Sequence, residues 1–197
     1  MESTRKKILQ TEIVRKSIHM CTAFVPLLLA HWYYPVIGLL FFALCCYVIC
    51  ELLRYYGHEV PIVSFVTIHA ARRHDTHYFV LGPVTLCVGV LITAIFFDSV
   101  PAKIGIWSLA FGDGLASLVG KLIGHTEIPH TNGKTIAGSF ACFTASFITC
   151  LIASEKIAFS LVIGCFAAII ELIPMKDFDN LVIPVLIAAI AQFYFHM

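Results

Sequence analysis

The stretch from Ser108 to His125, SLAFGDGLASLVGKLIGH, carries an aspartate, four glycines and a lysine within an otherwise apolar part of the chain. Asp113 lies about two helical turns inside this apolar run. A carboxylate at such a depth in a membrane costs several kcal/mol unless it is paired, hydrated or bound to a metal. We therefore expect a functional role for Asp113.

If this stretch is a helix, one of its faces combines a carboxylate with small residues. The face consists of Asp113, Ser117, Gly120 and Gly124 at steps of four, three and four, flanked by Gly112, Ala116 and Lys121. This pattern predicts a groove with a carboxylate deep inside it and an ammonium group near its mouth. For the glycines alone, helix packing is the alternative, because Gly120 and Gly124 form a GxxxG motif.

The segment that follows has the composition of a phosphate-binding turn. An Asn132–Gly133 turn precedes Lys134 and a new apolar run, whose first residues include Thr135, Gly138 and Ser139. Backbone N–H groups at a helix start, a nearby lysine and glycines that permit close approach all suit phosphate. The motif is not a P-loop, because Ile128 stands where that motif requires a glycine. An ordinary capped turn is the alternative.

Two further polar clusters could complete a site for a phosphorylated substrate. Arg15 and Lys16 precede the first apolar run, with His19 one turn further, and they could hold phosphate or only set topology. Glu171 and Asp179 flank a short turn near the end of the chain and offer the hard oxygen ligands that Mg²⁺ prefers. The clusters together predict phosphoryl or nucleotidyl transfer, which needs metal, cationic clamps and positioning more than covalent machinery.

Composition places these residues in a membrane protein. Of the 197 residues, 59% are hydrophobic and 13% are charged, whereas a soluble domain carries about 25% charged residues. At about 20 residues per span, the chain has room for about seven transmembrane helices. We expect one all-α, membrane-embedded domain over residues 1–197, with spans at 17–32, 35–53, 79–97, 104–123, 135–153, 157–174 and 180–196.

The positive charges are distributed unevenly over these spans. With the N-terminus in the cytoplasm, eleven of the thirteen Lys and Arg residues fall on the inner side, and Lys103 and Lys156 fall on the outer side. This is the positive-inside pattern, and the polar clusters fall on the inner side as well. We therefore expect a cytoplasmic active site, a basic cytoplasmic segment at 1–16 and an interfacial or re-entrant segment at 54–78.

Four motifs in order resemble one family of membrane enzymes. They are VRKSIH before the first span, ELLR after the second, FGDGLASLVGKLIG followed by GKTIAGS, and a closing ELIP…DN…IP. In this order they are similar to the CTP-dependent lipid-alcohol kinases, a family that includes dolichol kinase, phytol and farnesol kinases, yeast-type diacylglycerol kinase and short bacterial relatives. The resemblance extends from Arg15 to Pro184.

The resemblance implies transfer of the γ-phosphoryl group of CTP, with Mg²⁺ or another divalent cation, to the hydroxyl of a polyprenol, a diacylglycerol or a related lipid alcohol. Together with the patterns above, it implies catalytic roles for Asp113, Arg15, Lys16 and Lys121. The implied nucleotide-binding residues are Gly112, Gly114, Ser117, Gly120, Lys121, Gly124, Lys134, Thr135, Gly138 and Ser139. The candidate metal ligands are Asp113, Asp179 and Glu171.

Two other functions are alternatives. CDP-diacylglycerol synthases, which transfer CMP, are distantly similar to this family, but MKDFDN lacks the arginine of their closing Asp-Arg pair. A small ion-coupled transporter would need polar groups on both sides of the membrane or an internal repeat, and the sequence has neither. We expect a bacterial inner membrane, a lipid alcohol and a nucleotide as partners, and no nucleic acid. The particular lipid, homo-oligomerisation and the choice between base and metal ligand for Asp113 stay undetermined.

Overall fold

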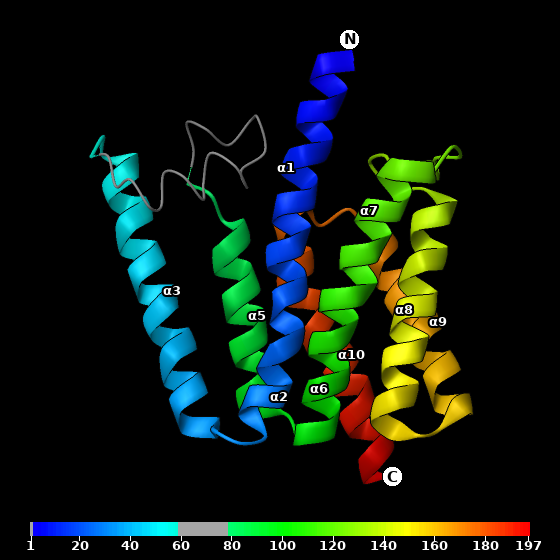
Figure 1. Ribbon diagram of the computed structural model, residues 1–197. Coiled ribbons are helices and arrows are strands. Elements are labelled where there is room, and N and C mark those ends of the chain that lie inside the picture. Colours follow the sequence, from blue (N-terminus) through cyan, green and yellow to red (C-terminus); the bar gives the residue numbers. More distant parts are fainter. Residues whose placement is uncertain (1, 59–78) are drawn as a thin grey trace.

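The apolar runs of the sequence fold into helices. The computed structural model describes residues 2–58 and 79–197, and the side chains of these ranges from Glu12 onward. The described residues are helical apart from turns and one isolated β-bridge between Glu127 and Thr135, as the sequence predicts. In chain order the elements are α1 (Glu2–Cys21), η1 (Thr22–Phe24), α2 (Val25–Leu29), α3 (Tyr33–Tyr55), α5 (Gly82–Phe96), α6 (Ser99–Trp107), η2 (Ser108–Asp113), α7 (Gly114–Ile123), α8 (Ile136–Ser154), α9 (Ile157–Leu172), η3 (Lys176–Phe178) and α10 (Asp179–His196) (Figure 1).

Within the described residues, four helical segments are long and apolar enough to cross a membrane. They are α3, the continuous stretch Ser99–Ile123, α8, and the stretch Lys176–His196. The shorter apolar helices α5 and α9 match two further expected spans, and the first expected span, 17–32, coincides with the end of α1, η1 and α2. Each expected span thus coincides with a helical segment, while a total of seven crossings stays a prediction. Most of the expected interfacial segment, 54–78, lies outside the described residues.

The hydrophobic core lies between the helices from α5 to α10. Its largest fully buried side chains come from α6, η2, α9 and α10 and include Ile104, Leu109, Ile163, Ile183 and Ile187. In contrast, α3 lies at the edge of the bundle beside α5 (Figure 1). It exposes Leu39, Phe41 and Phe42, as a lipid-facing helix does.

The long helical stretch Ser99–Ile123 contains a change of winding that the sequence analysis did not anticipate. Residues Ser108–Asp113 form the π-helical segment η2 between α6 and α7. A π-helical turn contains more residues than an α-helical turn, so it rotates the following helix face and commonly occurs at functional sites. Gly112 and Gly114 favour this departure because glycine is a weak helix former. Asp113 lies at the junction, where it is buried.

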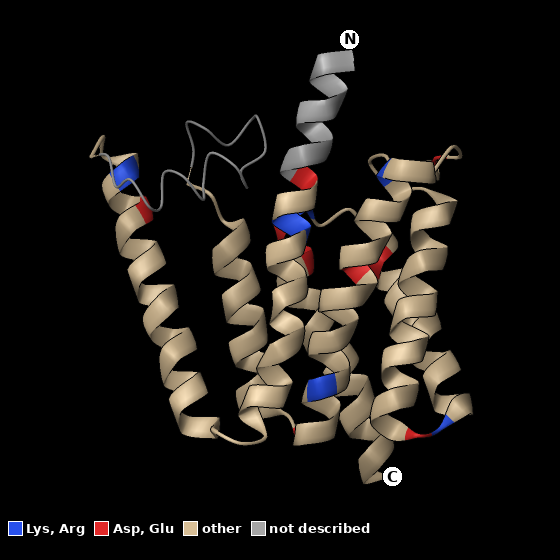
Figure 2. Cartoon of the chain, viewed as in Figure 1, with Lys and Arg blue, Asp and Glu red and all other residues tan. Residues whose placement is uncertain are grey.

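Charged residues gather toward one end of the bundle. Figure 2 shows most of the described lysines, arginines and acids near the end that carries the N-terminus. The opposite end carries the turns with Asp98, Glu155 and Lys156. The expected gathering of polar clusters on one side is therefore present in the fold. The cytoplasmic orientation of that side stays a prediction.

Candidate active site

A cavity of about 290 Å³ lies among α1, α7, the turn before α8 and the turn before α10. Five cationic and three acidic side chains line it, namely Arg15, Lys16, Lys121, Lys134, Lys176, Asp113, Glu171 and Asp179. Of these eight, all but Lys176 were expected from the sequence, and four further expected residues also line the cavity, namely Ser117, Gly120, Thr135 and Gly138. The fold thus brings together eleven of the fifteen expected site residues, from helices far apart in the chain.

Asp113 forms part of the cavity wall and is paired with a buried lysine. Lys16 Nζ donates a hydrogen bond to Asp113 Oδ2 in an ion pair whose members are both about 95% buried. His19 Nε2 lies 3.6 Å from the same oxygen. Among the described residues, the hydrogen bonds to Asp113 go to Oδ2, so Oδ1 is the oxygen that is left for a ligand. Lys16 supplies the countercharge that a buried carboxylate requires.

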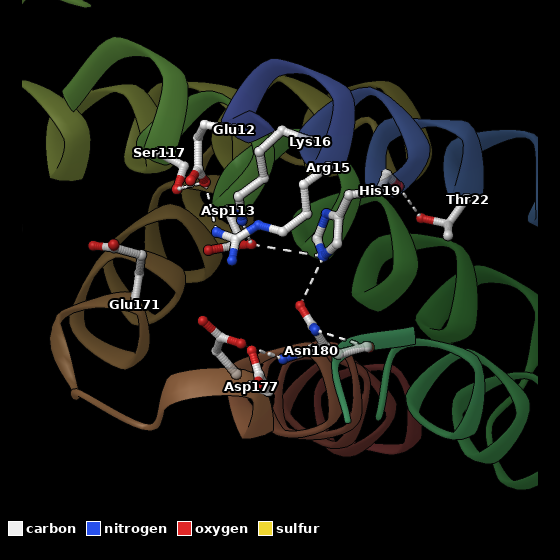
Figure 3. A network of polar contacts seen from close by, with 12 residues as sticks. Glu12, Arg15, Lys16, His19, Thr22, Asp113, Ser117, Glu171, Asp177 and Asn180 are labelled. Carbon is white, nitrogen blue, oxygen red and sulfur yellow. Dashed lines mark hydrogen bonds and ion pairs between the residues drawn. The ribbon is translucent and has the colours of Figure 1, made fainter. Parts of the chain in front are cut away.

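His19 and Asn180 connect this ion pair to α10. Asn180 Nδ2 donates to the carbonyl of Gly82 at 3.3 Å, and Asn180 Oδ1 lies 2.9 Å from His19 Nε2. Because an amide oxygen only accepts, His19 Nε2 must carry the proton of this bond. His19 Nδ1 is buried and has no hydrogen-bond partner among the described residues. Figure 3 shows His19 between Asp113 and Asn180.

Glu12 is a site residue that the sequence analysis missed. Its Oε1 accepts hydrogen bonds from Arg15 at 2.5 Å and from Ser117 at 3.3 Å, and its Oε2 pairs with Lys121. Burial alone would raise the pKa of Glu12, but the charges of Arg15 and Lys121 outweigh burial and hold the pKa below its ordinary value. The spacing of Glu12 and Arg15, three residues apart on one helix, was the available signal.

Glu171 and Asp179 approach the cavity from α9 and α10. Glu171 pairs with Lys134 at 3.1 Å and accepts a hydrogen bond from Ser139 at 3.4 Å, and Asp179 accepts the N–H of Asn180 at 2.9 Å. Within the part of the chain that the structure describes, no three His, Cys, Asp or Glu side chains form a group able to hold a metal. Mg²⁺ usually takes one or two carboxylates plus phosphates and waters. The carboxylates therefore fit a metal that binds together with a nucleotide.

The turn before α8 has the expected geometry but few free backbone donors. Asn132–Gly133 has both φ angles in the left-handed region, 55° and 86°, which this dipeptide tolerates. Thr135 caps α8 by accepting the N–H of Gly138 at 3.1 Å, and the N–H at the first position of α8 donates to the carbonyl of Thr126. Phosphate binding at this helix start would therefore depend mainly on Lys134.

Four expected nucleotide-binding residues lie outside the cavity lining, namely Gly112, Gly114, Gly124 and Ser139. An added Cβ would lie 2.6 Å from a side chain of α8 at Gly112 and 3.1 Å from a side chain of α1 at Gly114. At Gly124 it would collide with Thr135. These glycines allow the helices and the turn to pack closely around the cavity. Ser139 orients Glu171 through the hydrogen bond described above.

Comparison with curated proteins finds relatives that are lipid-alcohol kinases by name. The chain is 26% identical to a probable phytol kinase 1 of Glycine max, over 99% of this chain and 71% of the relative. It is 27% identical to the CTP-dependent diacylglycerol kinase 1 of Saccharomyces cerevisiae and 28% identical to the farnesol kinase of Arabidopsis thaliana, over 73% and 64% of this chain and about half of each relative. No family model and no solved structure matches the chain significantly. The relatives confirm the resemblance of this chain to the CTP-dependent lipid-alcohol kinases.

Proposed function

We propose that this integral membrane protein transfers the γ-phosphoryl group of CTP to the hydroxyl of a lipid alcohol. The observation that carries the proposal is the Asp113–Lys16 pair at the wall of a cavity lined by five cationic side chains. Cationic clamps and precise positioning are what phosphoryl transfer requires. The names of the relatives support a lipid alcohol as acceptor, and the name of the yeast relative supports CTP as donor.

The proposed reaction uses the free oxygen of Asp113. Arg15, Lys121 and Lys134, which all line the cavity, bind the phosphates of CTP. The lipid hydroxyl donates its proton to Asp113 Oδ1, and its oxygen forms a bond to the γ-phosphorus. The bond between that phosphorus and the β–γ bridging oxygen breaks, and the electron pair leaves with CDP. The products are a lipid monophosphate and CDP.

We assign the divalent cation to Glu171 and Asp179 rather than to Asp113. Asp113 Oδ2 already accepts a hydrogen bond from Lys16, and in the proposed reaction Oδ1 receives the proton of the lipid hydroxyl, so neither oxygen is left for a metal. Glu171 is paired with Lys134 and would exchange this partner for the metal when Lys134 binds phosphate. Glu171 and Asp179 line the same cavity and would share the metal with phosphate oxygens. When bound, the metal would neutralise negative charge on the phosphates as it develops during transfer.

The test is a labelling assay with the purified protein in lipid nanodiscs. CTP labelled at the γ-phosphorus is supplied with Mg²⁺ and a panel that contains a polyprenol, phytol, farnesol and a diacylglycerol. We expect label in the organic phase with one of these lipids, and none when EDTA is present. If α-labelled CTP transfers its label to the lipid instead, the chain is a cytidylyltransferase and the proposal is wrong.

We also propose seven spans, a cytoplasmic N-terminus and a bacterial inner membrane as the location. The separation of the charged end from the opposite end supports this orientation (Figure 2). Single cysteines at the exposed positions Asn132 and Glu155 test it in a variant without native cysteines. We expect a membrane-impermeant thiol reagent to label the second from outside and the first only in inverted vesicles. The reverse result would contradict the orientation.

A further inference from the structure

Glu12 joins two helices at the edge of the cavity. On α1 it pairs with Arg15, and on α7 it meets Ser117 and Lys121, which lie one turn apart. The Glu12 side chain is 8% exposed, whereas the side chains of Arg15 and Lys121 are 24% and 42% exposed. The anion therefore lies behind the two cations, and the cations, not the anion, line the cavity.

The two cations come from different helices and would repel each other without an anion between them. A buried carboxylate that receives hydrogen bonds from both partners fixes their separation. We infer that Glu12 is a positioning residue of the nucleotide site, which holds Arg15 and Lys121 side by side so that both can bind the phosphates of CTP. This inference rests on the proposed function.

The contacts of Glu12 leave donors available for a ligand. Arg15 uses Nη2 toward Glu12, and a guanidinium group has five N–H donors in a fixed plane. The side chain of Lys121 is 42% exposed and lines the cavity, so a ligand there can reach its ammonium group. Phosphate oxygens can thus bind to the same cations while Glu12 remains in place. For this reason Glu12 orients the clamp and does not block it.

The experiment measures CTP binding directly, by calorimetric titration in the presence of Mg²⁺. Losing a hydrogen-bonded charge typically costs about tenfold or more in affinity, so we expect Glu12→Gln to raise the Kd for CTP about tenfold. Glu12→Asp, which keeps the charge, should recover part of this loss. Glu155→Gln, at the opposite end of the bundle, is the matched control and should bind CTP like the wild type.

A double-mutant cycle separates positioning from a purely structural role. If Glu12 acts by positioning Lys121, Glu12→Gln should weaken CTP binding much less in a Lys121→Met background than in the wild type. A structural role would lower the folded fraction without changing the Kd of the folded protein. If Glu12→Gln does not fold, the same cycle can be measured with Glu12→Asp, in the wild type and in the Lys121→Met background.

The outcomes distinguish this inference from the proposed function. If the wild type neither binds CTP nor phosphorylates a lipid, the proposed function is wrong and the inference falls with it. If the wild type does both, but folded Glu12→Gln binds CTP with unchanged affinity, the inference alone is wrong.

Discussion

Two networks with nearly the same chemical groups lie at opposite ends of the bundle. Each joins an aspartate, a histidine and a side-chain amide: Asp113, His19 and Asn180 in one, and Asp98, His196 and Gln192 in the other. In the first network the aspartate and histidine side chains are both 5% exposed, whereas in the second they are 66% and 62% exposed. The chemical groups match, and the burial differs.

Burial decides what each network can do. Around Asp98, water screens the charges, and such an exposed cluster contributes little to stability. Around Asp113, screening is weak, so the carboxylate requires Lys16 as a partner and interacts strongly with whatever enters the cavity. An Asp–His–amide network therefore indicates a functional site only under two conditions. Its carboxylate must be buried, so that it requires a countercharge, and it must border a cavity in which a ligand can bind.

The comparison fails if the two aspartates are equally dispensable. We expect Asp113→Asn to reduce lipid phosphorylation by about a thousandfold, because the amide cannot accept the proton of the lipid hydroxyl. Asp98→Asn should keep nearly full activity. Initial rates with labelled CTP measure both, on protein shown to be folded by size-exclusion chromatography. Asp113→Asn with more than a tenth of wild-type activity would contradict the assignment.

The buried pair makes a prediction about stability that the exposed network does not share. Lys16→Met leaves Asp113 buried without its countercharge, so we expect the free energy of unfolding to fall by about 3–5 kcal/mol. Adding Asp113→Asn removes the remaining charge and should recover stability but not activity. Thermal unfolding in detergent measures the difference. If the double variant is no more stable than Lys16→Met, charge burial is not the cause.

The two histidines offer a matched comparison of smaller effect. His19→Gln disturbs the link from Asp113 to α10, so we expect kcat to fall about tenfold through misplacement of the carboxylate, with the Kd for CTP unchanged. His196→Gln should change neither quantity, because its network is exposed. Steady-state kinetics and CTP titration check both variants. Equal losses in the two would show that His19 has no special position.

The smallest expected effect concerns the pH dependence of the exposed network. Hydrogen bonds from His196 and Gln192 hold the pKa of Asp98 below its ordinary value. A lowered carboxyl pKa stabilises the fold above the unfolded pKa of about 3.9, and this contribution is lost as the pH falls through the folded pKa. The difference in melting temperature between wild type and Asp98→Asn should therefore be small at about pH 5 and smaller still below about pH 4. A difference that grows on acidification would contradict it.

Local patterns in the sequence predicted the helices and much of the cavity lining. The apolar runs predicted helices because backbone groups in a membrane must be satisfied within the segment. The cost of burying Asp113 marked it as functional before any contact was known. Asn132–Gly133 predicted its own turn, because this dipeptide tolerates left-handed backbone angles that other residues avoid.

Contacts between distant parts of the chain could not be obtained in this way. Lys16 and Asp113 are 97 residues apart, and Glu12 and Lys121 are 109 residues apart. Whether such groups meet depends on how α1 packs against α7 and on the rotation that η2 introduces. The same packing decides that Gly120 lines the cavity while Gly112 and Gly114 lie against neighbouring helices.

The amino-acid sequence by itself determined that this is a helical membrane protein with its charged groups at one end and an aspartate that needs a partner. It did so through composition, spacing and the cost of burial, which are properties of single segments. The tertiary structure alone decided that the partner is Lys16, that Glu12 joins Arg15 to Lys121, and that Asp98 stays in water. Those outcomes depend on which helix faces meet, and helix faces meet through packing of the whole bundle.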